Sequence, residues 1–192
     1  MFPKGLIVSS QALEGNPMKS TEKLASMAEA AAKGGACALR VDGADMVKEL
    51  KERTDVPIIA INKIKDKSGR TVITPCFEMA KELALASADI IALDATFYPS
   101  ELKDDLATLI KRIHEELGIL VMADISTVEE AVNASRLGAD AVSTTLAGYV
   151  PGHFTRAMSS TFQITVLLKK LPTKSLTRFW LPRDVSGLPM PS

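Results

Sequence analysis

Five polar side chains lie at or just past the ends of successive apolar segments: Gln11, Arg40, Lys63, Asp94 and Asp124. A lysine near apolar walls has a lowered pKa and can act as a base, or it can form a Schiff base with a carbonyl group. An arginine offers a rigid fork to a carboxylate, phosphate or carbonyl oxygen, and the aspartates can accept hydrogen bonds from sugar hydroxyls or tune the lysine. These residue types favour proton-transfer or carbonyl chemistry on a small polar molecule.

Each of these residues also has an ordinary structural role open to it. A lysine at a strand end can bury its stem and keep its amine in water, and an aspartate there can cap the following helix. His114 falls inside a predicted helix and His153 in an unpatterned segment, so both are expected to be bystanders. No arrangement in the sequence resembles a nucleophilic triad.

The segments that must position the five residues alternate between strand and helix. Strands are predicted at 5–10, 36–41, 55–63, 90–94, 119–124 and 140–144, with a small extra strand at 70–74. Helices are predicted at 21–33, 46–53, 75–86 and 101–116, the last being the longest, and after Ser126 or Thr127. This alternation indicates a parallel sheet with right-handed crossovers, in which all strands end at one edge. Because no Gly-rich dinucleotide motif follows the first strand, a (β/α) barrel is favoured over a doubly wound sheet.

An internal repeat supports this division of the chain. Small residues recur between helix end and strand start at Gly35-Ala36, Ser87-Ala88 and Gly138-Ala139. Small residues at these positions allow a tight turn from helix into strand.

Composition narrows the function classes. The formal net charge of the 192 residues is zero, which gives no attraction to nucleic acid or to an anionic membrane. Cys37 and Cys76 are too few for a disulfide framework, and no Cys or His cluster indicates a metal site. Neither a signal peptide nor a membrane-spanning run is apparent, so a cytoplasmic location is expected.

The pattern is lost after residue 149. Residues 1–149 supply six βα units, whereas 150–192 form an atypical tail in which only 160–170 is a candidate helix. A complete eight-stranded barrel usually needs about 250 residues. The expected fold is therefore an α/β TIM barrel that is incomplete, with six clear strands.

Several motifs resemble, in order over residues 5–149, the N-acylglucosamine-6-phosphate 2-epimerase (N-acetylmannosamine-6-phosphate 2-epimerase) family. The matching segments are 5–13, 38–43, 57–63, 72–75, 92–96, 122–127 and 143–149. The resemblance implies a TIM barrel that inverts C2 of an N-acetylated hexosamine 6-phosphate without a cofactor or metal. It implies that Lys63 is the acid/base, that Gln11, Arg40 and Asp124 hold substrate, and that Asp94 lies near the site. The implied partner is an amino-sugar phosphate, the implied context sialic acid catabolism, and a homodimer is a candidate assembly.

The sequence also departs from the family pattern. The family has an arginine soon after the 92–96 motif, where this chain has Phe97-Tyr98-Pro99. The family glutamate on strand seven, its second acid/base, has no counterpart in Ser175-Leu176-Thr177, and the Gly-rich phosphate loop of strand eight is absent. These departures predict a truncated or frameshifted chain. The alternatives are an inactive remnant, a sugar-phosphate-binding chain of the same fold, or a Schiff-base aldolase using Lys63.

Overall fold

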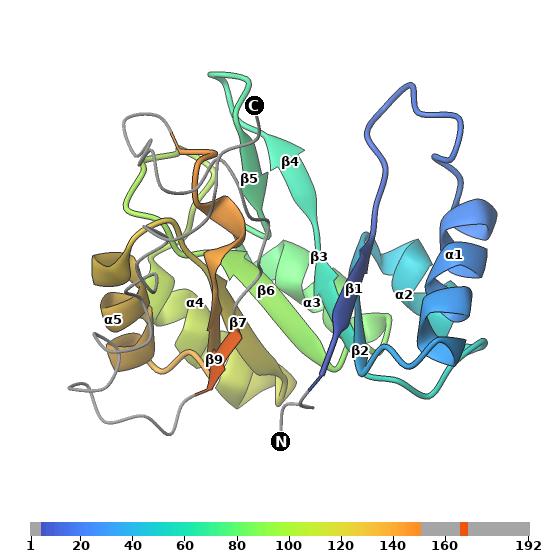
Figure 1. The fold of residues 1–192 in the computed structure, drawn as a ribbon. Coiled ribbons are helices and arrows are strands. Elements are labelled where there is room, and N and C mark those ends of the chain that lie inside the picture. The colour runs from blue at the N-terminus through green and yellow to red at the C-terminus, as the bar shows by residue number, and fades with distance from the viewer. Residues whose placement is uncertain (1–4, 151–165, 169–192) are drawn as a thin grey trace, which may run out of the picture.

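The computed structural model describes residues 5–150 and 166–168, which form a curled sheet with helices around it (Figure 1). The strands of the main sheet are β1 (Ile7–Ser10), β2 (Ala38–Asp42), β3 (Ile58–Ile61), β6 (Ile90–Asp94), β7 (Leu120–Asp124), β8 (Ala141–Ser143) and β9 (Val166–Leu168). The helices are α1 (Thr21–Lys33), α2 (Ala44–Lys51), α3 (Phe77–Leu85), α4 (Leu106–Arg112) and α5 (Val128–Leu137). A π-helical turn, Ile113–Leu117, extends α4, and a 3₁₀ turn, Thr144–Leu146, follows β8.

Strands β1 to β8 of the main sheet are parallel and pair in chain order. The order β1-β2-β3-β6-β7-β8 confirms the predicted βα alternation, and β9 then pairs antiparallel with β8. Between β3 and α3, the chain forms a separate antiparallel hairpin of β4 (Lys63–Lys65) and β5 (Thr71–Ile73). Figure 1 shows this hairpin rising beyond the end of β3, so it stands at the carboxyl edge of the sheet.

The two faces of the sheet bury different apolar clusters. The larger cluster lies between the strands and the helices, with Leu24, Val47, Leu83 and Leu109 among the helical members. The smaller cluster contains strand residues together with Ile73 of the hairpin, Leu146 and Val150. Because the second cluster contains no residue of α1 to α5, the helices cover one face of the sheet and the other face is the concave interior.

Side-chain caps set where α1, α4 and α5 begin. Ser20 Oγ accepts from Lys23 N at the start of α1, and Thr127 forms a capping box with Glu130 at the start of α5. The prediction of a helix at 101–116, expected to be the longest, was wrong about where the helix starts and about its length. Asp105 caps α4, which therefore begins at Leu106, and the longest helix in the described part of the chain is the 13-residue α1.

The repeat seen in the sequence has a backbone cause. Gly35, Ser87 and Gly138 have φ angles of 99°, 71° and 107°, in each case within two residues of a helix end. Glycine adopts this left-handed region at little cost, whereas Ser87 pays a steric penalty from its Cβ atom. The same backbone conformation therefore turns the chain from helix to strand in three of the units.

Two further expectations changed. The segment predicted as one strand over 55–63 divides, because β3 ends at Ile61 and Lys63 begins β4. Val166–Leu168 is a strand where a helix over 160–170 was a candidate, and the rest of the predicted tail lies outside the described residues.

The curled sheet of six parallel strands with helices on its convex face is a partial TIM barrel. Within the described segments, no helix combines the length and apolarity that a bilayer crossing requires.

Candidate active site

Three of the five predicted site residues lie on strands of the main sheet and belong to its concave side. Alternate residues of a strand face the same way, and the interior cluster contains Ala38, Ile90 and Met122. Counting onward by twos from these residues reaches Arg40, Asp94 and Asp124. Gln11 and Lys63 lie just past the ends of β1 and β3, at the carboxyl edge where TIM-barrel enzymes place their chemistry.

Lys63 and Gln11 are in direct contact across this mouth. The Lys63 Nζ donates a hydrogen bond to Gln11 Oε1, and Gln11 Nε2 donates to Ser9 Oγ at 2.8 Å. Desolvation by the surrounding protein is the main cause that lowers the pKa of Lys63 below its usual value, even though the residue as a whole is exposed. The Arg40 charge lowers this pKa further, while the Asp42 and Asp124 charges raise it.

Asp42 fixes the backbone from which Lys63 projects. Its Oδ1 accepts a hydrogen bond from Lys63 N at 3.0 Å, which ties the end of β2 to the start of β4. Burial raises the pKa of Asp42 above its usual value, and the Lys63 backbone N–H and amine oppose that rise. Sequence reasoning missed Asp42, although it directly follows the strand segment that carries Arg40.

Arg40 and Asp124 form a bidentate ion pair inside the curl of the sheet. Arg40 Nη2 lies 2.6 Å from Asp124 Oδ2, and Arg40 Nη1 lies 3.1 Å from Asp124 Oδ1. Their side chains are 3% and 0% exposed. Each group thus satisfies the other, and a substrate that contacts either must share these hydrogen bonds.

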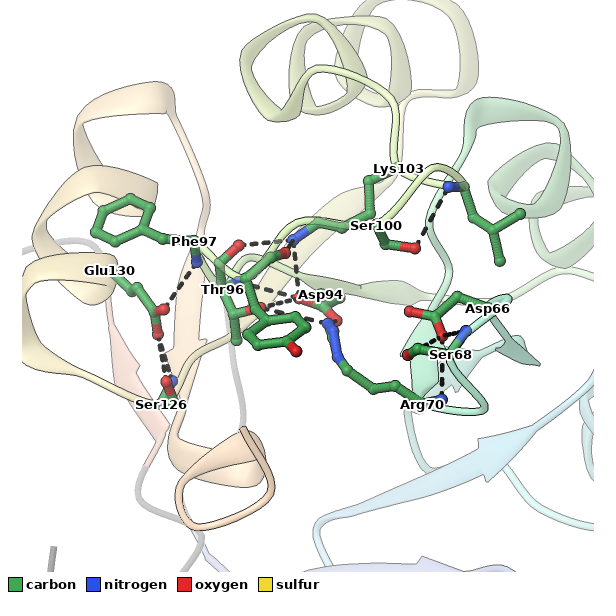
Figure 2. Close-up of polar contacts among 12 residues, drawn as sticks. Asp66, Ser68, Arg70, Asp94, Thr96, Phe97, Ser100, Lys103, Ser126 and Glu130 are labelled. Carbon is green, nitrogen blue, oxygen red and sulfur yellow. Dashed lines mark hydrogen bonds and ion pairs between the residues drawn. The ribbon is translucent and has the colours of Figure 1, made fainter. Parts of the chain in front are cut away.

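Asp94 is surrounded by donors (Figure 2). Its Oδ1 accepts from Thr96 N at 3.1 Å, from Thr96 Oγ1 at 2.6 Å and from Lys103 Nζ at 3.1 Å. Its Oδ2 accepts from Arg70 Nη2. Asp94 also lies in register with Asp124 on the neighbouring strand, so this cluster adjoins the Arg40–Asp124 pair.

Arg70 and Lys103 are the site cations that sequence reasoning missed. Arg70 comes from the β4–β5 hairpin and Lys103 from the loop before α4, and Figure 2 shows both side chains directed at Asp94. The Arg70 guanidinium carbon lies 4.8 Å from the centroid of the Tyr98 ring. No spacing rule links these residues to a strand end, so only the folded hairpin and loop reveal them.

A buried glutamate holds the loop that follows β6. Glu130 is 0% exposed, and its Oε2 accepts from Ser126 N and Thr127 N at 2.7 and 3.0 Å. Its Oε1 accepts from Phe97 N at 2.8 Å, which joins the start of α5 to the loop after β6. This bridge shapes the loop on which Tyr98 and Lys103 lie.

The remaining candidates lie elsewhere. His114 Nε2 is 2.7 Å from Asp140 Oδ2, next to the amino end of β8 and hence at the edge opposite the mouth. His153 lies outside the described residues. Within the described ranges, no group of three His, Cys, Asp or Glu side chains could hold a metal ion.

A family model described as "Putative N-acetylmannosamine-6-phosphate epimerase" matches residues 24–177. Two relatives named "Putative N-acetylmannosamine-6-phosphate 2-epimerase" come from Clostridium perfringens (strain SM101 / Type A) and Caldanaerobacter subterraneus subsp. tengcongensis. The first is 44% identical over 146 residues and the second 45% identical over 148 residues. Each match covers 76% of this chain, and it covers 66% of the first relative and 62% of the second.

A solved structure of the N-acetylmannosamine-6-phosphate 2-epimerase from Clostridium perfringens is also similar. It matches with a TM-score of 0.73 and 42% identity, covering 78% of this chain and 65% of that chain. This chain therefore spans about two thirds of the length of these relatives. The family model alone matches more than half of the sequence, and the fold agrees. The chain belongs to the N-acetylmannosamine-6-phosphate epimerase family.

Proposed function

We propose that this chain acts on N-acetylmannosamine 6-phosphate and transfers a proton at C2, the step that interconverts it with N-acetylglucosamine 6-phosphate. The observation that carries the proposal is Lys63, whose amine lies at the barrel mouth with a lowered pKa and a hydrogen bond to Gln11. A lowered pKa increases the neutral fraction of the amine, which is the form that can accept a proton.

The neighbouring groups fit the demands of this step. In the opened sugar, the aldehyde acidifies the C2 proton, and negative charge develops on the aldehyde oxygen as that proton leaves. In this proposal Lys63 accepts the proton, while Arg40 and Gln11 donate hydrogen bonds to substrate oxygens. Asp124 holds Arg40 in position.

Proton exchange at C2 tests the function without requiring inversion. Incubation with N-acetylmannosamine 6-phosphate in D₂O should remove the H2 signal from the proton NMR spectrum, and Lys63→Met should abolish this exchange. Lys65→Met is the matched control, because Lys65 is an exposed lysine on the same strand. If the wild-type chain leaves H2 intact, or if Lys63→Met exchanges it as fast, the proposal fails.

The same experiment separates the epimerase from its rivals. Appearance of N-acetylglucosamine 6-phosphate supports full inversion. Exchange without inversion supports a chain that lacks the second acid/base, as the sequence at 175–177 predicts. A Schiff-base aldolase would instead leave a borohydride-trapped adduct on Lys63.

As part of this proposal, the enzyme works in the cytoplasm in sialic acid catabolism. Light scattering tests whether it is a homodimer.

A further inference from the structure

The polar cluster at the end of β6 is almost fully paired internally. Asp94 accepts four hydrogen bonds, three at Oδ1 and one at Oδ2, and about four is the capacity of a carboxylate. The Asp94 side chain is also 0% exposed, so a sugar hydroxyl could reach it only by displacing one of these donors. The carboxylate is therefore a poor direct ligand for substrate.

Lys103 is equally occupied. An ammonium group has three protons to donate, and Lys103 Nζ lies within hydrogen-bond distance of three acceptors. These are Asp94 Oδ1 at 3.1 Å, Thr96 O at 2.6 Å and Tyr98 O at 3.4 Å. Lys103 thus anchors the loop after β6 to Asp94 and keeps no proton for a ligand.

Arg70 is the exception in the cluster. Its Nη2 donates to Asp94 Oδ2 and lies 3.5 Å from Thr96 Oγ1, whereas its Nη1 is buried with no hydrogen-bond partner. Among the described residues, Nη1 is the one buried side-chain nitrogen or oxygen in this condition. Buried donors are normally paired, and an unpaired charged donor is especially unfavourable.

We propose that Arg70 Nη1 is a substrate contact, donating a hydrogen bond to a hydroxyl or carbonyl oxygen of the sugar. This inference rests on the proposed function. Arg70 belongs to the hairpin that begins with Lys63, and its partner Asp94 lies in register with Asp124, so the donor belongs to the same mouth. In a complete TIM barrel, phosphate is commonly bound by the loops after the last two strands, so we assign a donor beside β6, the fourth strand, to the sugar portion of the substrate.

The Arg70 guanidinium lies over the Tyr98 ring, and Nη1 is shielded from solvent. A sugar that reaches Nη1 therefore has to displace some of the atoms that shield it. Asp94 acts through Arg70 as a positioning residue, since it holds Nη2 while Nη1 turns to the ligand.

Calorimetric titration with N-acetylmannosamine 6-phosphate tests the proposal. Arg70→Met and Arg70→Lys should each raise Kd by about 10-fold or more. Neither side chain has a guanidinium group, whose two Nη atoms can donate to Asp94 and to the sugar at the same time. Arg112→Met is the matched control. Arg112 also pairs with a carboxylate, Glu116, and stacks on an aromatic ring, Phe77, but it lies on α4 away from the mouth. Lys103 keeps Asp94 charge-paired in the variants, and thermal melts check that they fold.

The outcomes separate a direct sugar contact from a purely structural role of Arg70. Kd unchanged within 2-fold in Arg70→Met, with a lowered melting temperature, would mean that a trapped water satisfies Nη1 and would overturn the proposal. Equal weakening in Arg112→Met would also overturn it. If Arg70→Met weakened binding of inorganic phosphate as much as binding of the sugar phosphate, the sugar-oxygen assignment would be wrong. If the wild-type chain neither bound the sugar phosphate nor exchanged its C2 proton, the proposed function itself would fail, and this contact with it.

Discussion

Arg40 of β2 and Asp124 of β7 are joined by two hydrogen bonds although β3 and β6 lie between their strands. Three strand spacings in a flat sheet would separate the two strands by about 14 Å. Curvature turns the two side chains toward each other, so the ion pair and the barrel-like shape of the sheet depend on one another. The pair connects strands that make no ladder hydrogen bonds with each other.

Removing one member of this pair should destabilise the fold strongly. Asp124→Leu leaves the Arg40 guanidinium charged and unpaired in the interior, and we expect a loss of about 3–5 kcal/mol in the free energy of unfolding. Urea denaturation followed by circular dichroism measures this loss. The double variant Arg40→Met/Asp124→Leu should recover most of it, since no buried charge is then left alone. A double variant as unstable as the single one would contradict this account of the loss.

Replacing Asp42 should make Lys63 less basic. The Asp42 carboxylate is the largest contribution that raises the pKa of Lys63, opposing desolvation, which lowers it. Asp42→Asn retains an oxygen for the Lys63 backbone N–H but removes the charge, so the pKa of Lys63 should fall further. The neutral amine then forms at lower pH, and proton exchange at C2 should begin at lower pH as well. NMR titration of ¹³C-methylated lysines, assigned with Lys63→Arg, measures the change, and a rise in that pKa would refute it.

Replacing Ser87 by glycine should stabilise the protein. Ser87 has a φ angle of 71°, and its Cβ atom imposes a steric cost of about 1 kcal/mol that glycine does not pay. The greater flexibility of glycine in the unfolded chain reduces the gain, so Ser87→Gly should raise the free energy of unfolding by up to about 1 kcal/mol. Gly138→Ala, at the equivalent position with φ of 107°, should lower it. Thermal melts compare the stability of both variants with that of the original protein. A lower stability of Ser87→Gly would contradict the proposed backbone strain at Ser87.

Glu130 should matter for the stability of the mouth without touching substrate. Glu130→Ala leaves the N–H groups of Phe97, Ser126 and Thr127 without their acceptor, and we expect a loss of about 3 kcal/mol. Glu130→Gln keeps one carbonyl oxygen and should lose less. Chemical denaturation of the two variants measures the difference. Equal losses would show that the stabilisation by Glu130 depends on its negative charge and not on its number of acceptor atoms.

The fold of residues 5–150 was largely predictable because each strand is a compact apolar run between a small-residue turn and a polar end. The helix start at Leu106 was not predictable in the same way. Pro99 and Ser100 begin a segment with helical composition, but Lys103 is occupied by Asp94 and by two backbone carbonyls, which holds the loop out of the helix. A tertiary contact thus overrode local helix propensity.

The site was predictable where its residues sit on strands and not where they sit on connections. Arg40 and Asp124 were expected to meet because parallel strands end at one edge of the sheet, and the structure joins them directly. Arg70 and Tyr98 belong to a hairpin and a loop, and their contact depends on how those connections fold over the mouth. The family substitution at Phe97-Tyr98-Pro99 was visible in the sequence, but the arginine beside Tyr98 comes from 28 residues earlier in the chain. The assigned roles of the five predicted site residues stay predictions.

The pairing of strands in chain order bears on how the protein is made. Each strand from β2 to β8 in the main sheet adds to the strand that precedes it there, so each new pairing needs only chain that a ribosome has already released. The Arg40–Asp124 pair becomes available once β7 has emerged, and at that stage the mouth residues Gln11, Arg40, Lys63, Asp94 and Asp124 have all left the ribosome. Assembly of this half of the mouth can therefore begin during synthesis, before the segment beyond residue 150 has left the ribosome.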